Sequence, residues 1–313
     1  MKAQIKEAVY KPKKKKLLQD IKKRPTLYLM IVPAIVYFAI FAYLPMYGAS
    51  IAFMNYTPIK GYMGSDLVGF KHFLNFFNDP YFGRLIRNTL TISISDLIFN
   101  FPLPIILALL LNELKLPRLK RTVQTVSYIP HFISMVVVCG MIKDFTNESG
   151  IITKFLEAFG VEQMSMLSNP KYYVPIHIVS NMWQTAGWSS IIYIAAISGI
   201  DEQLYEAAEI DGAGRFRQAL SITLPSIMGT ITILLIMRVG RILSVGYEKI
   251  ILLYNPAIYE TSDVISSYVY RKGLQEFSWS YSTAVGLFNS CANIILLALA
   301  NKITKKMGQS GLF

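Results

Sequence analysis

The sequence predicts an all-α integral membrane protein, and three observations carry that prediction. Of the 313 residues, 53% are hydrophobic and 16% are charged, whereas soluble proteins have roughly 25% charged residues. The mean hydropathy is +0.41. The apolar residues gather in six long segments that are almost free of charge, each long enough to cross about 30 Å of hydrocarbon as a helix. Helices are expected because unpaired backbone groups are costly in lipid and the alternation typical of strands is missing.

The six predicted spans alternate with polar or charged segments. Several of them contain Pro or Gly, which a bundle of neighbouring helices tolerates. In chain order the predicted spans are residues 27–50, 88–111, 123–142, 173–198, 222–243 and 281–303.

The positions of Lys and Arg set the predicted orientation. Residues 1–26 hold ten of the 31 lysines and arginines, and six spans place other basic segments on the same side as this tail. Because basic residues favour the cytoplasmic side, both termini are expected inside. The predicted domains are a basic cytoplasmic tail (1–26), a six-helix transmembrane domain (27–303) and a second cytoplasmic tail (304–313). The net charge of +12 is therefore interpreted as topology, and no nucleic-acid partner is expected.

Patterns that carry catalysis or bind metal are missing from the sequence. His72, His131 and His177 show no HExxH or Cys/His spacing, so packing is the preferred interpretation and no metal site is expected. The segment GSDLVGFK (64–71) lacks the Gly-Lys-Ser/Thr ending of a phosphate loop. The chain is not expected to be an enzyme or to hydrolyse ATP. An ion-coupled carrier is the alternative, but Asp96 is the one acid deep in a predicted span.

The segment EAAEIDGAGRFRQALSITLP (206–225) is a charged stretch between two uncharged ones. Residues 202–209 suit a helix, and Asp211-Gly212 ends it because Gly permits a left-handed turn. A second helix is expected from Arg215, with Pro225 near the entry to the bilayer. Small residues such as Ala207 would let a partner approach closely. The residues alone leave two alternatives open, partner docking and an ordinary connection between spans.

The same segment resembles a known motif. Its pattern is similar to the EAA loop of permease subunits of bacterial ABC importers. The pattern consists of Glu206-Ala207-Ala208, three residues, Gly212, nine residues and then Ile-x-Leu-Pro. DEQLYEAAEIDGAG with ITLP resembles the maltose-type, carbohydrate-uptake branch. Two further segments are similar to parts of the permeases for polysaccharide-derived oligosaccharides of Gram-positive bacteria, namely GYEKIILLYNPAIYETSDVISSYVYRKGL and YSTAVGLFNSCANIILLALANKI. The resemblance implies the type I ABC importer permease fold in a bacterial cytoplasmic membrane, with a coupling loop at residues 201–221.

The resemblance also implies partners and a mechanism. Such a permease forms a heterodimer with a second homologous permease, binds a cytoplasmic ATPase dimer and receives an oligosaccharide from an extracellular, lipid-anchored solute-binding protein. ATP and Mg are used by the ATPase, and no cofactor is expected on this chain. The coupling loop would dock on the ATPase and transmit its motion to the bundle. The implied coupling residues are Glu206, Ala207, Ala208, Asp211, Gly212 and Arg215.

A candidate substrate pathway lies on either side of the coupling loop. Asn181, Gln184 and Trp188 recur at helical spacing and share a face, which suits either sugar binding or helix packing through polar groups. The resemblance to maltose-type permeases places Asn181, Gln184, Thr185, Trp188, Arg238 and Arg241 on stretches that line the cavity.

Arg238 and Arg241 distinguish this chain from the maltose permease, which carries neutral residues at the matching positions. Two arginines in a partly desolvated cavity favour carboxylates, so an acidic, uronate-containing oligosaccharide is one hypothesis. The alternatives are that the arginines reach the outer headgroups, or pair with Asp96 or with an acid of the partner permease, and that the sugar is neutral.

Overall fold

The computed structural model describes residues 22–308 and 311–312, which are mostly helical. The Lys-rich run of the N-terminal tail lies outside the described residues. The chain divides into two compact units, residues 1–51 and 52–313. Among the described helices, three are long and apolar enough to cross a membrane, or five if each of two bent pairs counts as one span. Six spans with both termini inside therefore remain a prediction.

The described part of the first unit is one apolar helical run, which continues to residue 53. α2 (Pro25–Phe38) leads through a π-helical turn, η1 (Ala39–Tyr43), into α3 (Leu44–Met46) and the 3₁₀ turn η2 (Tyr47–Phe53). Pro45 lacks an N–H, and its ring crowds the carbonyl four residues earlier, which lies in η1; the wider π turn relieves that crowding. None of the most apolar window of this run is buried.

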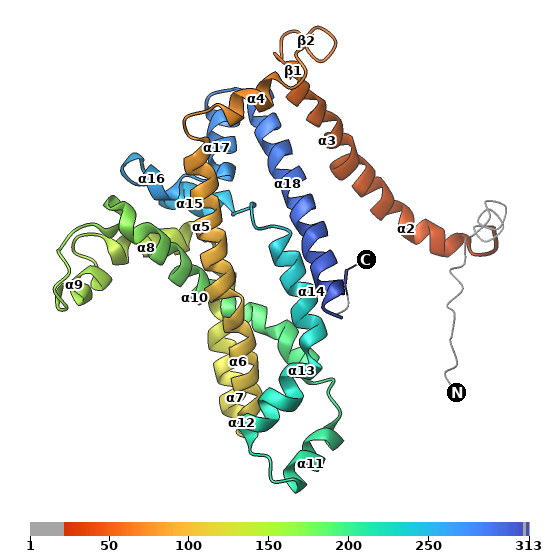
Figure 1. Cartoon of the computed structure of the whole chain (residues 1–313), viewed down its shortest axis with the longest axis vertical. Helices are drawn as coiled ribbons and strands as arrows, with labels where there is room; N and C mark the ends of the chain where they lie inside the picture. The colour runs from red at the N-terminus through yellow and green to blue at the C-terminus, as the bar shows by residue number, and fades with distance from the viewer. Residues whose placement is uncertain (1–21, 309–310, 313) are drawn as a thin grey trace. The chain divides into compact units, whose positions relative to one another are not determined.

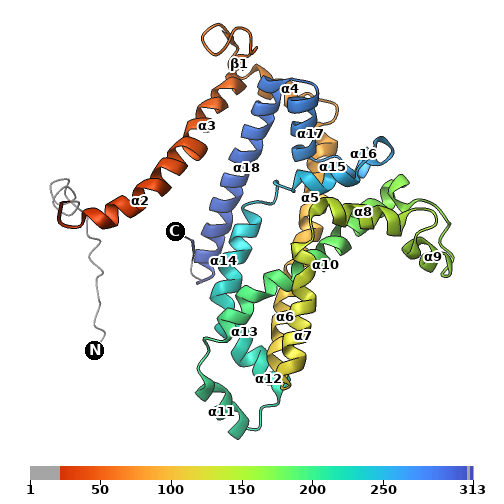
Figure 2. The same ribbon diagram turned by 180° about the vertical axis from the view of Figure 1, so that it is seen from behind.

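The second unit is built around two long helical columns. α5 (Phe82–Asn100) and α6 (Pro102–Glu113) form one candidate span of 32 residues. α10 (Pro170–Ile197) packs along α5, α6 and α7 (Pro117–Tyr128), as Figures 1 and 2 show. Gly187 makes the close approach of α10 to α7 possible, because a Cβ there would lie 2.0 Å from the backbone oxygen of Ser127.

The structure breaks two of the predicted spans, which were expected as continuous helices. In the third, the column of α7 and the 3₁₀ turn η3 (Ile129–Phe132) meets α8 (Met135–Thr146) and α9 (Ile151–Glu157) at 97°. Pro130 lies in η3, and Ser134 starts α8 afresh by accepting a hydrogen bond from the Val137 amide.

The fifth predicted span bends at Ile227. α12 (Arg215–Gln218), the π turn η5 (Ala219–Thr223) and α13 (Leu224–Ser226) meet α14 (Met228–Val239) at 61°. Pro225 crowds the carbonyl of Ser221 inside η5, so this π turn repeats the arrangement before Pro45. α14 ends at Val239 rather than at 243, because residues 240–246 leave the helix.

The remaining elements belong to the second unit. Buried side chains of α4, α5, α17 and α18 form one apolar cluster there, and α5, α8, α10 and α15 contribute to a second. These elements are a two-stranded hairpin, β1 (Met54–Asn55) and β2 (Asp66–Leu67), followed by α4 (Lys71–Phe77), η4 (Met166–Ser168), α11 (Glu202–Ile210), α15 (Tyr247–Leu253), η6 (Pro256–Ile258), α16 (Tyr259–Ser262), α17 (Ile265–Tyr270), η7 (Arg271–Gln275) and α18 (Trp279–Lys306).

Candidate functional site

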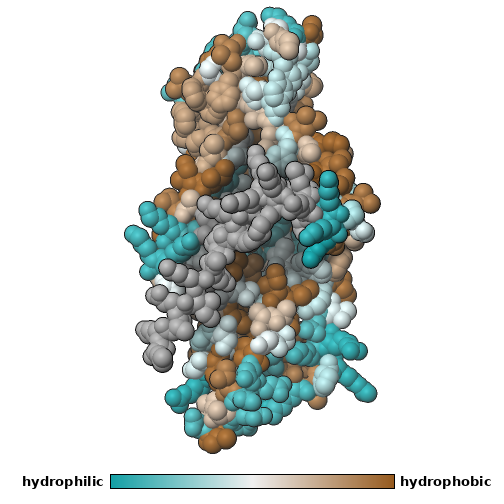
Figure 3. Space-filling view, turned by 90° about the vertical axis from the view of Figure 1, so that its right-hand side faces the viewer, coloured by the Kyte–Doolittle hydropathy of each residue, from teal (hydrophilic) through white to brown (hydrophobic). Residues whose placement is uncertain are grey.

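The coupling loop, residues 201–221, forms the helix–Gly–helix unit that the sequence predicts. Asp201 accepts a hydrogen bond from the Gln203 amide at 3.0 Å and caps α11. Gly212 has a φ of +76°, in the left-handed region that a residue with a Cβ enters at a cost. α12 then begins at Arg215. Hydrophilic side chains gather around this end of the second unit (Figure 3).

Most of the residues expected to couple to an ATPase are accessible in the coupling loop. Ala208 is half-buried, and the exposed ones are Glu206, Ala207, Asp211, Gly212 and Arg215. Two apolar side chains that the sequence analysis did not single out are also exposed, Ile210 by 87% and Phe216 by 79%. Exposed apolar side chains beside small and acidic residues are typical of a surface that binds another protein.

Three hydrogen bonds hold the coupling loop in shape. The Tyr205 hydroxyl pairs with the Thr223 hydroxyl at 2.8 Å. The Arg215 guanidinium donates to the backbone oxygen of Glu113, the last residue of α6, at 3.4 Å. The Gln218 amide donates to the Ala213 oxygen at 2.9 Å. The loop is thus bonded to α6 and to η5.

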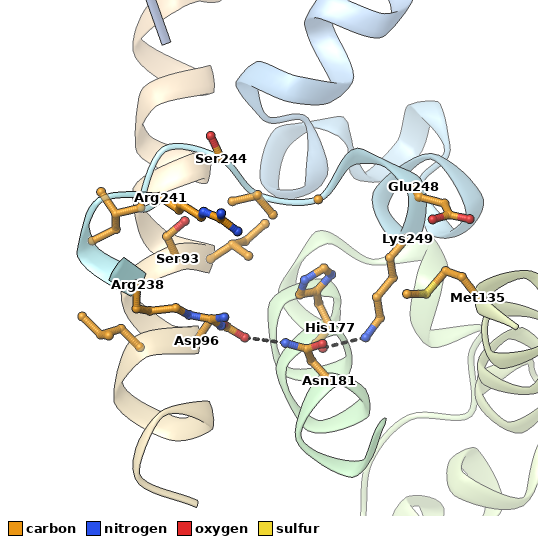
Figure 4. A pocket seen from close by; sticks show the side chains of 15 residues that line it. Ser93, Asp96, Met135, His177, Asn181, Arg238, Arg241, Ser244, Glu248 and Lys249 are labelled. Atoms are coloured by element: carbon orange, nitrogen blue, oxygen red, sulfur yellow. Dashed lines mark hydrogen bonds and ion pairs between the residues drawn. The ribbon is translucent and has the colours of Figure 1, made fainter. Parts of the chain in front are cut away.

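A cavity of about 360 Å³, which we call the first cavity, opens between α5, α10, α14 and α15 (Figure 4). Its polar lining comes from four separate parts of the chain. The lining side chains with polar groups are Ser93, Asp96, His177, Asn181, Arg238, Arg241, Ser244, Glu248 and Lys249.

Asp96 is the centre of a polar cluster at one wall of the first cavity. It forms an ion pair with Arg238 and accepts hydrogen bonds from the side-chain amides of Asn181, at 2.6 Å, and Asn100. These four residues come from α5, α10 and α14. Of the alternatives open for Arg238, the structure therefore contains the pair with Asp96. The Arg238 side chain keeps 47% of its surface exposed in this single chain, against 13% for Asp96.

Two further cations reach the first cavity without an acidic partner. Lys249 is 5% exposed, and its Nζ donates to the backbone oxygen of His177 at 3.2 Å. Arg241 is exposed and extends into the cavity (Figure 4). Among the described residues, no carboxylate lies within ion-pair distance of either. Glu248 also lines the cavity but extends away from Asp96 and Arg238 (Figure 4).

Burial changes the proton affinity of Lys249, which lies on α15, outside the spanning helices. Removal from water disfavours the ammonium form and lowers its pKa to about 8. Lys249 therefore still carries its charge at neutral pH, where it provides a desolvated cation to the cavity.

A second cavity of about 600 Å³ lies on the other side of Asn181 and Arg238, which line both. The Trp188 ring lines it and stacks on the His131 ring with 4.7 Å between centroids and 3° between planes. Flat aromatic faces of this kind suit the C–H faces of sugar rings. Thr185 and Asn100 line the same cavity.

The structure brings together five of the six residues expected to line a substrate pathway. Arg241 lines the first cavity, Thr185 and Trp188 line the second, and Asn181 and Arg238 line both. Gln184 lines neither: it is 5% exposed, and its Oε1 has no partner among the described residues.

Sequence reasoning missed Lys249 and assigned His131 to packing. The signal available for Lys249 was a lone cation at the start of an apolar run, GYEKIILL. No cluster of three or more metal-binding side chains occurs among the described residues.

Residues 100–307 match the family described as "Binding-protein-dependent transport system inner membrane component". The match includes the whole coupling loop, Asn181, Arg238 and Lys249.

Curated relatives of known sequence match almost the whole chain. The chain is 45% identical over 304 residues to the polygalacturonan/rhamnogalacturonan transport system permease protein YteP of Bacillus subtilis, covering 97% of this chain and 95% of the relative. It is 45% identical over 294 residues to protein LplB of Bacillus subtilis, covering 94% and 92%.

Solved structures show the same fold. A bacterial alginate ABC transporter in complex with an alginate pentasaccharide-bound periplasmic protein contains a chain that matches with a TM-score of 0.86 at 43% identity, covering 95% of this chain and 99% of that one. A second structure, of a bacterial ABC transporter involved in the import of the acidic polysaccharide alginate, matches with a TM-score of 0.85 at 43% identity, covering 93% and 99%.

Proposed function

This chain belongs to the family of binding-protein-dependent transport system inner membrane components, and we propose that it forms half of the path by which an acidic oligosaccharide enters a bacterial cell. As a permease component of an oligosaccharide ABC importer, it transports and is not itself an enzyme. The substrate would be a uronate-containing oligomer, bound first through its carboxylates.

The observation that carries the proposal is the charge of the first cavity. Arg241 and Lys249 present two cations that no acid among the described residues neutralises. An unpaired cation in a partly dry cavity is costly unless a ligand supplies the missing anion. Carboxylates of a uronate chain would supply it through charge-assisted hydrogen bonds. The names of two relatives support this chemistry, since polygalacturonan and alginate are polymers of uronates.

The second cavity would then hold sugar rings by their faces. The stacked pair of Trp188 and His131 offers an aromatic surface, and Thr185 and Asn181 offer groups for sugar hydroxyls. Aromatic faces bind rings whether or not these carry charge, so this cavity supports recognition of an oligosaccharide and leaves discrimination by charge to the first cavity.

We propose the remaining parts of the importer from the family resemblance. A second homologous permease would complete a heterodimer, an ATPase dimer would bind the coupling loops and use ATP and Mg, and a solute-binding protein would deliver the sugar from outside. Six spans with both termini in the cytoplasm would place the coupling loop on the ATPase side. The hydrogen bonds of Tyr205 and Arg215 support a mechanical role for the loop, and a periplasmic protein is part of one related structure.

Uptake by cells that lack this gene tests the proposal. We expect the deletion to abolish uptake of a labelled oligogalacturonate, and the wild-type gene to restore it. The matched competitor is the carboxyl-reduced form of the same oligomer, which keeps the sugar skeleton without the charge, and it should compete poorly. Equal competition by the reduced oligomer would make the importer one for neutral sugars. Unchanged uptake in the deletion strain would remove the transport assignment for both substrates.

A further inference from the structure

The two cavities meet at one polar cluster. Asn181 and Arg238 line both cavities, and Asp96 lines the first while accepting from Asn100, which lines the second. The Asp96–Arg238 ion pair joins α5 to α14, and the hydrogen bond from Asn181 to Asp96 joins α10 to α5. The cluster of Asp96, Arg238 and Asn181, which we call the charge lock, therefore lies where the two cavities adjoin.

Asp96 already binds Arg238 as a substrate carboxylate would. The pair joins one carboxylate to one guanidinium, and the Arg238 side chain keeps 47% of its surface exposed in this chain. Arg241 lines the same cavity three residues further along the chain, just beyond the end of α14, so a carboxylate held by Arg241 would lie near Arg238. Asp96 would keep its hydrogen bonds from Asn181 and Asn100 after losing Arg238.

Opening the charge lock costs different amounts for different substrates. Breaking the ion pair leaves the carboxylate of Asp96, which is 9% exposed, without its cation whichever substrate enters, so the difference between substrates lies at Arg238. A uronate replaces one carboxylate on Arg238 by another, so the guanidinium stays paired throughout. A neutral sugar offers Arg238 only hydroxyls, which bind a charged group more weakly than a carboxylate does.

We infer that the charge lock of Asp96, Arg238 and Asn181 holds the path closed and is opened by the substrate, whose carboxylate takes the place of Asp96 on Arg238. This inference rests on the proposed function and adds its selectivity step: Asp96 excludes neutral oligosaccharides by occupying Arg238 until an anion displaces it.

Transport by the complete importer in proteoliposomes tests the charge lock. The measured quantities are uptake of the oligogalacturonate, uptake of its carboxyl-reduced form, and ATPase activity without substrate. Asp96→Asn removes the ion pair of the charge lock. We therefore expect the ratio of reduced-oligomer uptake to acidic-oligomer uptake to rise at least about tenfold. The ATPase activity without substrate should rise as well. Asp144→Asn, an exposed acid on α8, is the matched control and should leave both ratios unchanged.

A second variant keeps the test decisive if Asp96→Asn fails to assemble because Arg238 is left unpaired. Asp96→Asn/Arg238→Gln removes both charges in one step and should transport the acidic and reduced oligomers with similar rates. The inference is overturned if whichever variant assembles keeps the wild-type preference and the wild-type substrate-free ATPase activity. Failure of the proposed function looks different, because the wild-type importer itself would then transport both oligomers alike.

Discussion

Removal of the buried cation of the first cavity should weaken the binding of acidic substrates selectively. Lys249 is 5% exposed, and its ammonium group has no acidic partner among the described residues. Lys249→Met keeps the length of the side chain and its apolar stem but removes that group. A hydrogen bond to a charged group contributes about 1.5–3 kcal/mol. We therefore expect the concentration of oligogalacturonate for half-maximal uptake to rise about tenfold to a hundredfold.

Arg241 provides the comparison that tests the physical reasoning. It lines the same cavity but is exposed, and exposed ion pairs contribute about 0.2–1 kcal/mol. Arg241→Gln should therefore raise the half-maximal concentration by no more than about fivefold. Lys154→Met, at an exposed lysine of α9, should change nothing.

The assay is uptake into proteoliposomes that contain the complete importer, with the carboxyl-reduced oligomer measured in parallel. Both cavity variants should leave the half-maximal concentration of the reduced oligomer unchanged. Equal losses for the acidic and reduced oligomers would refute the charge argument, and a larger loss for Arg241→Gln than for Lys249→Met would refute the argument from burial.

The pH profile gives an independent check on Lys249. Because burial lowers its pKa to about 8, the ammonium group loses its proton as the pH rises through that value. The wild-type importer should therefore bind the acidic oligomer more weakly at pH 9 than at pH 7. Lys249→Met should lack this loss, and a variant that retains it would assign the titration to another group.

Three further predictions concern the framework that holds the site. Gly187→Ala would place a Cβ 2.0 Å from a backbone oxygen of α7. This overpacking costs about 1–3 kcal/mol, so the melting temperature of the purified importer should fall by several degrees. The control, Gly140→Ala, has nothing within 4 Å of the added Cβ and should not lower the melting temperature. Gly212→Ala would place an alanine at a φ of +76°, which costs about 1–2 kcal/mol. The variant should reduce substrate-stimulated ATPase activity without changing oligosaccharide binding. Equal loss of ATPase activity and of binding would contradict a coupling role. Burial raises the pKa of Asp79, but hydrogen bonds from Tyr268, the Tyr81 amide and Tyr281, helped by Lys272, outweigh it and hold that pKa below its usual value. The stability that ionised Asp79 gives the folded protein is complete above pH ~4 and is lost as the pH falls below that value. Tyr268→Phe should therefore make the melting temperature less sensitive to acid. An unchanged dependence of the melting temperature on pH would exclude Asp79 as the cause.

The coupling loop was predictable residue by residue because its structure is local. Asp201, Gly212 and Arg215 define a cap, a left-handed turn and a helix start through their own backbone and nearest neighbours. The same holds for the apolar columns, whose composition alone predicts membrane helices. The breaks at residues 133–134 and 227 were not predictable, because Pro is tolerated in many membrane helices and neighbouring packing decides whether the helix bends.

The lining of the cavities depends on tertiary contacts that helical spacing does not contain. Lys249 falls beyond the predicted fifth span and reaches the first cavity only because residues 240–246 leave the helix and α15 turns back beside α10. Gln184 shares the spacing of Asn181 and Trp188, yet it packs into the interior. The pairing of Arg238 with Asp96 was one alternative among several, since a single sequence does not state which helices face each other.

The π turn η5 sets the direction in which the side chains of the following helix, α14, point around the helix axis. A turn closed by bonds between residues i and i+5 accommodates one residue more than an α-helical turn, and successive residues of an α-helix are about 100° apart around its axis. Deletion of one residue from η5 would restore a regular helix and rotate the side chains of α14 by about 100°, which would turn Arg238 away from Asp96. Five residues that line neither cavity thus determine which way Arg238 faces: a one-residue deletion among them would abolish selectivity while leaving the composition of both cavities intact.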